Sequence, residues 1–336
     1  MSRLCLYFKN DTMADRWFPG DRHPRRILRR LVRGPDPIGG VERVFLNLCE
    51  GLDRIEVPYV KNLPFDQLQP GDRVGVLGRG PHCLSGYRHP DIPIVAGIGL
   101  MTHPSEWPDL MKDYPVKVYL QHCEWAADIY RPYYGDRNVD LWPVGIHTER
   151  WTPQPAIEKD LDVLIYDKIR WRRDDPEPQE PRARQIEELL AARGLSSLTL
   201  TYGSYTPVEY QDALSRCRSM IFLCEHESQG LAYQEALSCD IPILAWENGY
   251  CLDPNYQNWE KKKVRATSVP FFDERCGEKF RDLSDVERQF DQFWQRVGQG
   301  DYAPREYILE NLTLEHCSRR FLRFFEDDYV NTTAPQ

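Results

Sequence analysis

Two glutamates that stand eight positions apart, Glu227 and Glu235, are the residues of this chain best placed to do chemistry, and Gly230 and Leu231 lie between them. A carboxylate accepts hydrogen bonds from hydroxyl groups. A glycine lets the chain turn tightly, so that backbone N–H groups can approach a ligand. A helix that begins at this point would also attract a phosphate group. The segment therefore indicates a ligand that carries both hydroxyls and phosphates.

The surrounding pattern places these glutamates at the end of a buried strand. The apolar run at 219–223 predicts that strand, and the spacing of Leu231–Ser238 predicts a helix. Glu227 then lies in the strand-to-helix loop, whereas Glu235 lies about one turn inside the helix. The next apolar run, at 241–246, predicts a further strand.

This arrangement resembles the Glu-x7-Glu motif of retaining glycosyltransferases with the GT-B fold, above all glycosyltransferase family 4. The family pattern Glu-Gly-Phe-Gly-Leu and Glu-Ala stands here as Glu-Ser-Gln-Gly-Leu at 227–231 and Glu-Ala at 235–236. The resemblance implies that Glu227 holds the donor sugar and Glu235 the ribose hydroxyls, and that the amides of Gly230 and Leu231 hold the diphosphate. Ser-Gln replaces the family's Gly-Phe pair, which leaves the identity of the sugar open. The alternative is two glutamates on a solvated helix face.

Three further segments resemble the family in the same order along the chain. Gly39 and Gly40 open an amphipathic helix like the family's Gly-Gly-x-Glu-Arg segment, whose glycine amides face the donor phosphates and the acceptor; a plain N-cap glycine pair is the alternative. Residues 143–151 resemble the interdomain Asn-Gly-Val-Asp segment, with His147 in place of the aspartate. The tail from Pro304 to Phe325 resembles the C-terminal helix that crosses back onto the first domain.

Cations for the diphosphate are expected after the first strand of the second half. The family has an Arg and a Lys there, and Lys168 and Arg173 have the family's spacing, with Arg170 an equally good candidate. Such side chains would stabilise negative charge on the leaving nucleoside diphosphate. A solvated basic loop is the alternative.

Three more residues are candidates for the site. Gly203 and Tyr205 follow the strand expected at 198–202, where they would border the nucleotide base. His122 ends the strand expected at 116–121. The family often has a histidine at this strand end near the reacting sugar, although a histidine in such a place is as often simply packed.

We expect no metal ion and no cofactor apart from the nucleoside-diphosphate sugar that serves as donor substrate. No Asp-x-Asp pair follows an apolar strand, and the pair at 174–175 lies in a polar loop, which is a poor metal site. Cationic side chains are expected to take the role of the metal. The other partner would be an acceptor with a free hydroxyl group.

Composition narrows the class of protein. The net charge of −9 argues against general nucleic-acid binding. The sequence has no signal-peptide pattern and no apolar run of membrane-spanning length. Ten cysteines occur without any Cys-x-x-Cys pair, which is typical of reduced core residues in a cytoplasmic protein.

One strongly basic segment stands apart in this acidic chain, with six arginines between Arg22 and Arg33. Apolar residues would line one face of a helix here and arginines the other, as in helices that lie on an anionic membrane. The segment could equally hold an anionic acceptor or form a solvated helix. A peripheral location on the inner face of the membrane is therefore one expectation.

Strand and helix signals alternate along the chain, which favours parallel sheets. We expect an α/β protein with two Rossmann-like domains that face a cleft (the GT-B fold), in which the C-terminal helix crosses back to the first domain. The predicted domains are residues 1–150 for the acceptor, 151–302 for the nucleotide sugar, and a C-terminal segment at 303–336. Expected strands in the first half cover 4–8, 57–60, 73–77, 92–96, 116–121 and 139–144.

The predicted function is a retaining, hexosyltransferase-type glycosyltransferase of polysaccharide, glycolipid or glycoconjugate synthesis. It would move a sugar from a nucleoside diphosphate to an acceptor hydroxyl. One alternative is a nucleotide-sugar epimerase on the same fold, which needs no acceptor. Another is a catalytically silent subunit that binds the sugar nucleotide.

Overall fold

The structure, a computed structural model, describes residues 2–10, 24, 25, 28, 38–171, 182–326 and 329. Most of the basic segment from Arg22 to Arg33 lies outside these residues, as do Arg173 and the predicted polar loop at 172–181. The chain divides into two compact units. The first comprises Met1–Gln121, Ala127–Trp142 and Ser318–Gln336, and the second His122–Ala126 and Pro143–Cys317. The domain boundaries at 150 and 302 stay predictions.

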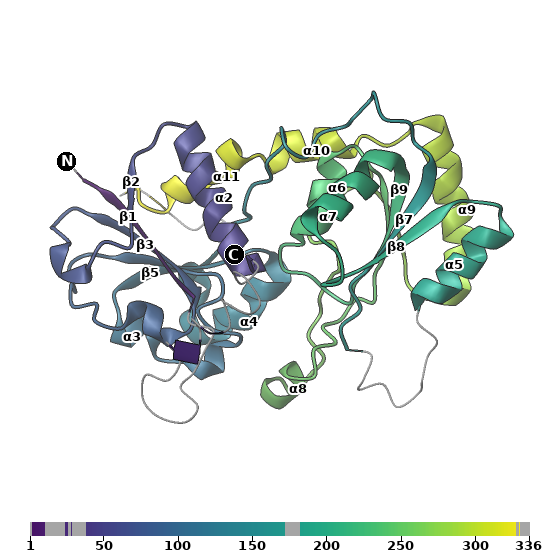
Figure 1. The fold of residues 1–336 in the computed structure, drawn as a ribbon. Coiled ribbons are helices and arrows are strands. Elements are labelled where there is room, and N and C mark those ends of the chain that lie inside the picture. The colour runs from purple at the N-terminus through teal and green to yellow at the C-terminus, as the bar shows by residue number, and fades with distance from the viewer. Residues whose placement is uncertain are drawn as a thin grey trace. The chain divides into compact units, whose positions relative to one another are not determined.

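The first unit is built on a six-stranded parallel sheet (Figure 1). Its strands follow the order β2-β1-β3-β4-β5-β6. They cover Leu4–Asn10 (β1), Tyr59–Lys61 (β2), Arg73–Arg79 (β3), Ile94–Gly97 (β4), Val116–Gln121 (β5) and Val139–Leu141 (β6). The longer helices of this unit are α2 (Gly40–Arg54) and most of α4 (Glu124–Tyr134), whose first residues belong to the second unit, and a short helix, α3, covers Leu110–Asp113.

The second unit holds a five-stranded parallel sheet in the order β11-β10-β9-β7-β8. These strands cover Leu161–Asp167 (β7), Ser197–Thr201 (β8), Cys217–Leu223 (β9), Ile243–Trp246 (β10) and Gly277–Phe280 (β11). Helices in this unit are Arg182–Ala192 (α5), Pro207–Arg216 (α6), Leu231–Ser238 (α7), Tyr256–Trp259 (α8), Leu283–Gln299 (α9) and Pro304–Asn311 (α10).

The second sheet is covered on both faces because its central strands are apolar on both sides. Along β9, Met220 and Phe222 enter one core, whereas Ile221 and Leu223 enter the other. The first core also contains residues of α6, α7 and α10, and the second contains residues of α5 and α9. Figure 1 shows α5 and α9 on one side of the sheet and α6 and α7 on the other. The unit is therefore doubly wound, which confirms the predicted α/β class.

The predicted bounds of β5 and α7 agree with the structure, whereas the other predicted strands differ from it in one or both bounds. The strand predicted at 139–144 ends at Leu141, because Pro143 has no N–H and the backbone of Val144 bonds to the side chain of Gln229. The strands predicted at 57–60 and 92–96 begin two residues later, at Tyr59 and Ile94.

The tail that was predicted to form one helix from Pro304 to Phe325 forms two, α10 and α11 (Leu314–Arg323). They separate at Thr313, whose backbone bridges to Ile146 and whose hydroxyl accepts a hydrogen bond from the amide of His316. Helix α11 begins in the second unit and ends in the first. The predicted crossing of the C-terminal segment back to the first domain is thus confirmed.

Candidate functional site

The loops that carry the predicted site residues meet at one edge of the second sheet. Strand β7 lies between β8 and β9, so the chain leaves β7 toward one side and later returns on the other. The loops that follow β7 and β9 therefore diverge at the carboxyl ends of these two strands. Open α/β sheets bind ligands in the crevice at such a point. Lys168 follows β7 directly, and Glu227 lies in the loop after β9.

An ion pair joins these two loops. The ammonium group of Lys168 contacts the carboxylate of Glu227, and the two side chains are 12% and 14% exposed. Burial is the largest single influence and lowers the pKa of Lys168, but the charge and hydrogen bond of Glu227 and the nearby Cys224 together raise that pKa above its ordinary value. Lys168 therefore carries a positive charge at neutral pH. It contacts a carboxylate that, like Lys168 itself, keeps a small part of its surface exposed to solvent.

A tyrosine that the sequence analysis did not single out holds two cations at the same edge. The ring of Tyr202, the residue after β8, lies 4.8 Å from Lys168 Nζ and 5.0 Å from Arg170 Cζ. Cations are attracted to the face of an aromatic ring at such distances. The side chain of Arg170 is exposed. Tyr202 thus gathers two positive charges at the sheet edge, which suits a diphosphate.

Glu225 fixes the loop that carries Lys168 and Arg170. Its carboxylate accepts hydrogen bonds from the backbone amides of Arg170 (2.8 Å) and Trp171 (3.1 Å). Burial raises the pKa of Glu225, because a charged carboxylate is disfavoured away from water. Two hydrogen bonds that backbone amides donate to one buried carboxylate thus hold the loop after β7 against the loop after β9.

Gly230 starts α7 in a backbone conformation that suits only glycine. Its φ of +76° and ψ of +50° lie in the left-handed region, and an added Cβ would lie 2.1 Å from the ring of Tyr233. The first amides of a helix have no carbonyl one turn earlier to bond. In α7 they point toward the loop that bears Glu227, which makes this end of the helix suited to an anion. Leu231 packs its side chain against the core, so only its amide is a candidate contact.

Glu235 lies half-buried in α7, beside a cluster of tyrosines. Burial raises the pKa of Tyr205; the nearby Glu235 charge raises it further, whereas the Lys168 charge lowers it. The hydroxyls of Tyr166 and Tyr205 also bond to each other. The charges of Glu235 and Lys168 therefore both reach the hydroxyl of Tyr205.

The backbone of Glu227 is held on both sides by residues that no sequence pattern indicated. Its amide donates to the carbonyl of Thr267 (2.9 Å), and its carbonyl accepts from the indole N–H of Trp125 (2.9 Å). Trp125 and Glu227 are 102 positions apart, so no local signal connects them. Gln229, at the place of the family's Phe, bonds instead to Val144 and Gln234.

The other predicted residues that the structure describes have the following surroundings, and Arg173 lies outside the described residues. His122 is 6% exposed in the segment that precedes Trp125, and His147 Nδ1 accepts from the amide of Arg150, as a turn cap does. Gly203 is exposed with a φ of +84° and open space around it. Gly39 and Gly40 are exposed at the start of α2, in the first unit.

The described residues include neither a metal-binding cluster nor a membrane-spanning helix. Among them, no three His, Cys, Asp or Glu side chains converge in a way that could hold a metal ion. Nor does any helix in the described ranges have the length and apolar character needed to cross a membrane. None of the ten cysteines, all of which lie in the described ranges, is joined in a disulfide, and every one except Cys251 is buried.

Comparison with known proteins gives a likeness of structure only. No protein-family model matches the chain, and no curated protein matches it in sequence. AviGT4, a glycosyltransferase involved in avilamycin A biosynthesis, is 12% identical with a TM-score of 0.51, over 96% of this chain and 97% of that one. Sucrose-phosphate synthase from Thermosynechococcus elongatus is also 12% identical at 0.51, over 96% and 98%.

A TarM mutant from S. aureus, in complex with fondaparinux, alpha-GlcNAc-glycerol and UDP, is 13% identical with a TM-score of 0.51. That likeness covers 84% of this chain and 59% of the TarM chain. At such low identities these likenesses establish the fold and nothing finer. Two parallel sheets in Rossmann-like units, with a C-terminal helix shared between the units, give the chain the GT-B fold.

Proposed function

We propose that this chain is a retaining glycosyltransferase that moves a sugar from a nucleoside diphosphate to an acceptor hydroxyl. The observation that supports this most is the ion pair between Lys168 and Glu227 beside the left-handed Gly230. A cation, a carboxylate and a helix start stand together at the carboxyl edge of a doubly wound sheet. These groups match the phosphates and hydroxyls of a nucleotide sugar.

Each group takes one part of the donor in this proposal. The diphosphate lies against the first amides of α7 and against Lys168 and Arg170, with Arg173 as a further candidate cation. Glu235 accepts hydrogen bonds from the ribose hydroxyls, and Tyr205 lies next to it. Gly39 and Gly40 are candidates for the phosphates and acceptor, Gly203 for the border of the base, and His122 for the reacting sugar.

Binding of the donor requires an exchange of partners. Lys168 is paired with Glu227 in this structure, so the incoming diphosphate must attract the ammonium group away from the carboxylate. Glu227 is then available to accept hydrogen bonds from the sugar. Lys168 and Arg170 stabilise the charge that develops on the leaving nucleoside diphosphate. The acceptor oxygen bonds to the anomeric carbon on the face from which the leaving group departs, as the bond from that carbon to the phosphate oxygen breaks. The hydroxyl proton passes to that departing phosphate oxygen, and the anomeric configuration is retained.

A donor screen followed by product analysis tests this proposal. Binding of UDP, GDP, dTDP and ADP is measured first by calorimetry, and the matching nucleotide sugars are then incubated with a set of sugar and lipid-linked hydroxyl acceptors. We expect acceptor-dependent release of one nucleoside diphosphate and a product whose anomeric proton coupling matches that of the donor. Turnover in the presence of EDTA is expected, because cationic side chains are proposed in place of a metal ion.

The same experiment separates the rival functions. An epimerase would convert the nucleotide sugar to an isomer without an acceptor. A silent subunit would bind a nucleoside diphosphate without any turnover. Inversion at the anomeric carbon, or activity that EDTA removes and magnesium or manganese restores, would contradict the proposed mechanism.

We further propose a cytoplasmic protein that reaches a membrane-borne acceptor through the basic segment from Arg22 to Arg33. The support is its charge: six arginines in twelve positions of a chain with net charge −9. Anionic lipid attracts such a segment. An anionic acceptor remains the other proposed partner of these arginines.

A further inference from the structure

A cavity lies within the first unit, at the amino ends of its strands. Its volume is about 200 Å³. Ten residues from the starts of β3, β4 and β5 and from the segment after α11 line it: Gly71, Asp72, Arg73, Asp91, Ile92, Pro93, Val95, Lys117, Phe324 and Phe325. None of the candidate donor-site residues is among them. We infer that this cavity binds a small hydroxylated anion, of the class of a monosaccharide phosphate.

The anion would bind to two cations. The Nε atom of Arg73 is buried and has no hydrogen-bond partner among the described residues. A buried donor without a partner costs free energy, which a ligand oxygen would recover. Lys117 Nζ donates to the carbonyl of Glu326 (2.9 Å), and an ammonium group carries three donors, so two remain for a ligand.

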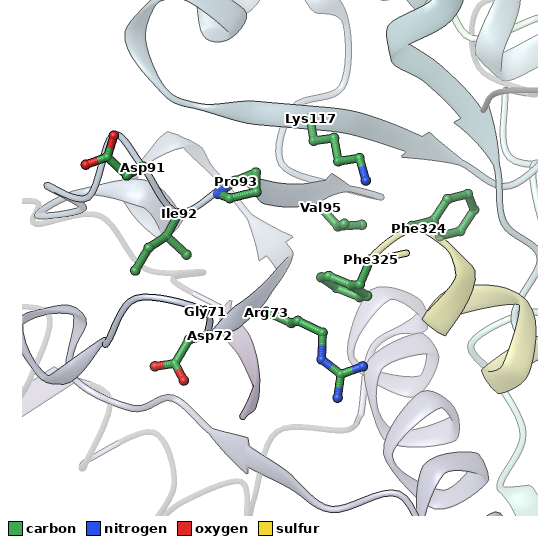
Figure 2. A pocket seen from close by; sticks show the side chains of 10 residues that line it. All are labelled: Gly71, Asp72, Arg73, Asp91, Ile92, Pro93, Val95, Lys117, Phe324 and Phe325. Carbon is green, nitrogen blue, oxygen red and sulfur yellow. The ribbon is translucent and has the colours of Figure 1, made fainter. Parts of the chain in front are cut away.

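The charges in the cavity are separated by sign. In Figure 2, Lys117 and Arg73 extend toward the side of Phe325, whereas the carboxylates of Asp72 and Asp91 lie on the opposite side. A ligand with one negative end and one hydroxylated end matches this arrangement. Its charged group would contact the two cations, and its hydroxyls would donate to a carboxylate.

Asp72 does not cancel the attraction for an anion. Its carboxylate is already paired with the guanidinium group of Arg3 (2.5 Å) and accepts hydrogen bonds from the amides of Gln69 and Arg3. These bonds, the one from Arg3 first, lower the pKa of Asp72 to about 2. The exposed carboxylate of Asp91 is then the group best placed to accept from a ligand hydroxyl.

The apolar lining and the size favour a ring of sugar size. Ile92, Val95 and Phe324 are buried, and Phe325 presents its ring to the cavity in Figure 2. A sugar ring can place its C–H face on such a surface. Pockets for drug-sized ligands run to about 300–1,000 Å³. The smaller volume here excludes a whole nucleotide sugar and suits a single phosphorylated ring.

Binding would also tie the segment after α11 to the sheet of the first unit. Phe324, Phe325 and Glu326 follow the helix that begins in the second unit, and Lys117 already bonds to Glu326. A ligand that contacts both sides of the cavity stabilises their association. The amides of residues 319–326 should then exchange more slowly with deuterium when the ligand is present.

Calorimetry with glucose 6-phosphate as the probe tests the inference on the full chain. Free glucose and inorganic phosphate are the part-ligand probes, and saturating UDP blocks the proposed donor site. We expect glucose 6-phosphate to bind with or without UDP, and at least tenfold more tightly than either part. Arg73→Gln and Lys117→Gln should each weaken it at least tenfold. Arg137→Gln, at an exposed arginine of the same unit outside the cavity, should leave it unchanged.

Three results would overturn the inference. The first is no binding by the wild type, and the second is equal binding by Arg73→Gln and the wild type. The third is complete displacement of glucose 6-phosphate by UDP, which would mean that the measured heat of binding comes from the donor site. If Arg73→Gln fails to fold, the variant Asp91→Asn at an exposed position replaces it. Asp91→Asn should lose the preference for glucose 6-phosphate over inorganic phosphate. An unchanged preference for glucose 6-phosphate would count against the site. Slower deuterium exchange at 319–326 on addition of the probe is an independent requirement.

Discussion

Lys168 and Glu227 stand 59 positions apart in sequence and form an ion pair at the carboxyl edge of the second sheet. The pairing of β7 with β9 brings them together, because Asp167 and Leu223 are opposite each other in register and the amide of Lys168 donates to the carbonyl of Leu223 (2.8 Å). The two groups that we propose to bind phosphate and sugar therefore neutralise each other before the donor arrives.

Breaking this pair should separate its structural role from its role in turnover. Lys168→Met leaves the charge of the Glu227 carboxylate without a partner. Removal of one partner of a fully buried ion pair costs about 3–5 kcal/mol of stability. The cost should be smaller here, because water still reaches part of both side chains. The double variant Lys168→Met/Glu227→Gln should recover most of that stability. Urea unfolding measures the stability and donor turnover the activity. Recovery of turnover together with stability would contradict the proposed role of the pair in catalysis.

The two glutamates should affect binding and turnover differently. Glu235→Ala is expected to weaken nucleoside-diphosphate binding by about 1.5–3 kcal/mol, because hydrogen bonds from the ribose to a charged group are lost. Glu227→Gln should retain that binding and lose most turnover. Calorimetry and initial rates measure the two effects. Glu287→Ala, at an exposed position of α9, is the control and should match the wild type. Unchanged nucleotide affinity in Glu235→Ala would refute the assignment of this residue.

Gly230→Ala and Gly203→Ala form a matched pair of variants. Both glycines have positive φ, +76° and +84°, so an alanine pays about 1–2 kcal/mol of backbone strain at either position. Only at Gly230 does the new Cβ meet an aromatic ring, at 2.1 Å. Gly230→Ala should therefore be the less stable variant in thermal unfolding and should lose nucleotide affinity through displacement of the α7 amides. Equal losses of thermal stability in the two variants would mean that the ring of Tyr233 moves aside without cost.

The buried Glu225 should make stability depend on pH. Burial raises its pKa above the ordinary value of 4.5, so the folded chain keeps this proton at pH values where the unfolded chain has released it. Its contribution to the free energy of unfolding is therefore fully present below 4.5 and falls as the pH rises through the folded pKa. Glu225→Gln keeps an acceptor oxygen and does not titrate. Urea unfolding at a series of pH values above 4.5 should therefore show that Glu225→Gln becomes more stable relative to the wild type as the pH rises.

The control for that prediction is Glu225→Leu, which removes the acceptor. The amides of Arg170 and Trp171 then lose their partner, at a cost of up to about 1–3 kcal/mol for each amide that water does not reach. Turnover should fall in Glu225→Leu and persist in Glu225→Gln. A stability difference between Glu225→Gln and the wild type that stays constant with pH would show that Glu225 does not titrate in this range.

The basic segment should bind anionic vesicles if it docks on a membrane. Each basic side chain near an anionic surface contributes about 1 kcal/mol. Sedimentation with anionic lipid should therefore be strong, fall with added salt, and weaken when Arg25, Arg26, Arg29 and Arg30 become Gln. Equal partitioning to neutral and anionic vesicles, or none to either, would leave the segment as a solvated helix or an acceptor site.

The sequence alone determined the elements whose signals are local. Strand β5 and helix α7 have the predicted bounds because an apolar run and a helical spacing are read within a few residues. The Glu227–Glu235 segment was recognisable for the same reason, since its residues lie within one strand–loop–helix unit. Helix α9 and strand β11 were not predicted, although the buried residues Val286, Phe290 and Phe293 of α9 stand at helical spacing.

Only the tertiary structure decided which partners these residues meet. The order of the strands places the loop of Lys168 beside that of Glu227, and no local pattern encodes that order. Tyr202 collects its two cations and Gln229 reaches Val144, 85 positions away, for the same reason. Chain segments far apart in sequence approach each other only when the sheet assembles, since burial of apolar surface drives that assembly and does not depend on sequence separation. The chemistry of the site could therefore be predicted from residue types, whereas its pairing of charges follows from the fold.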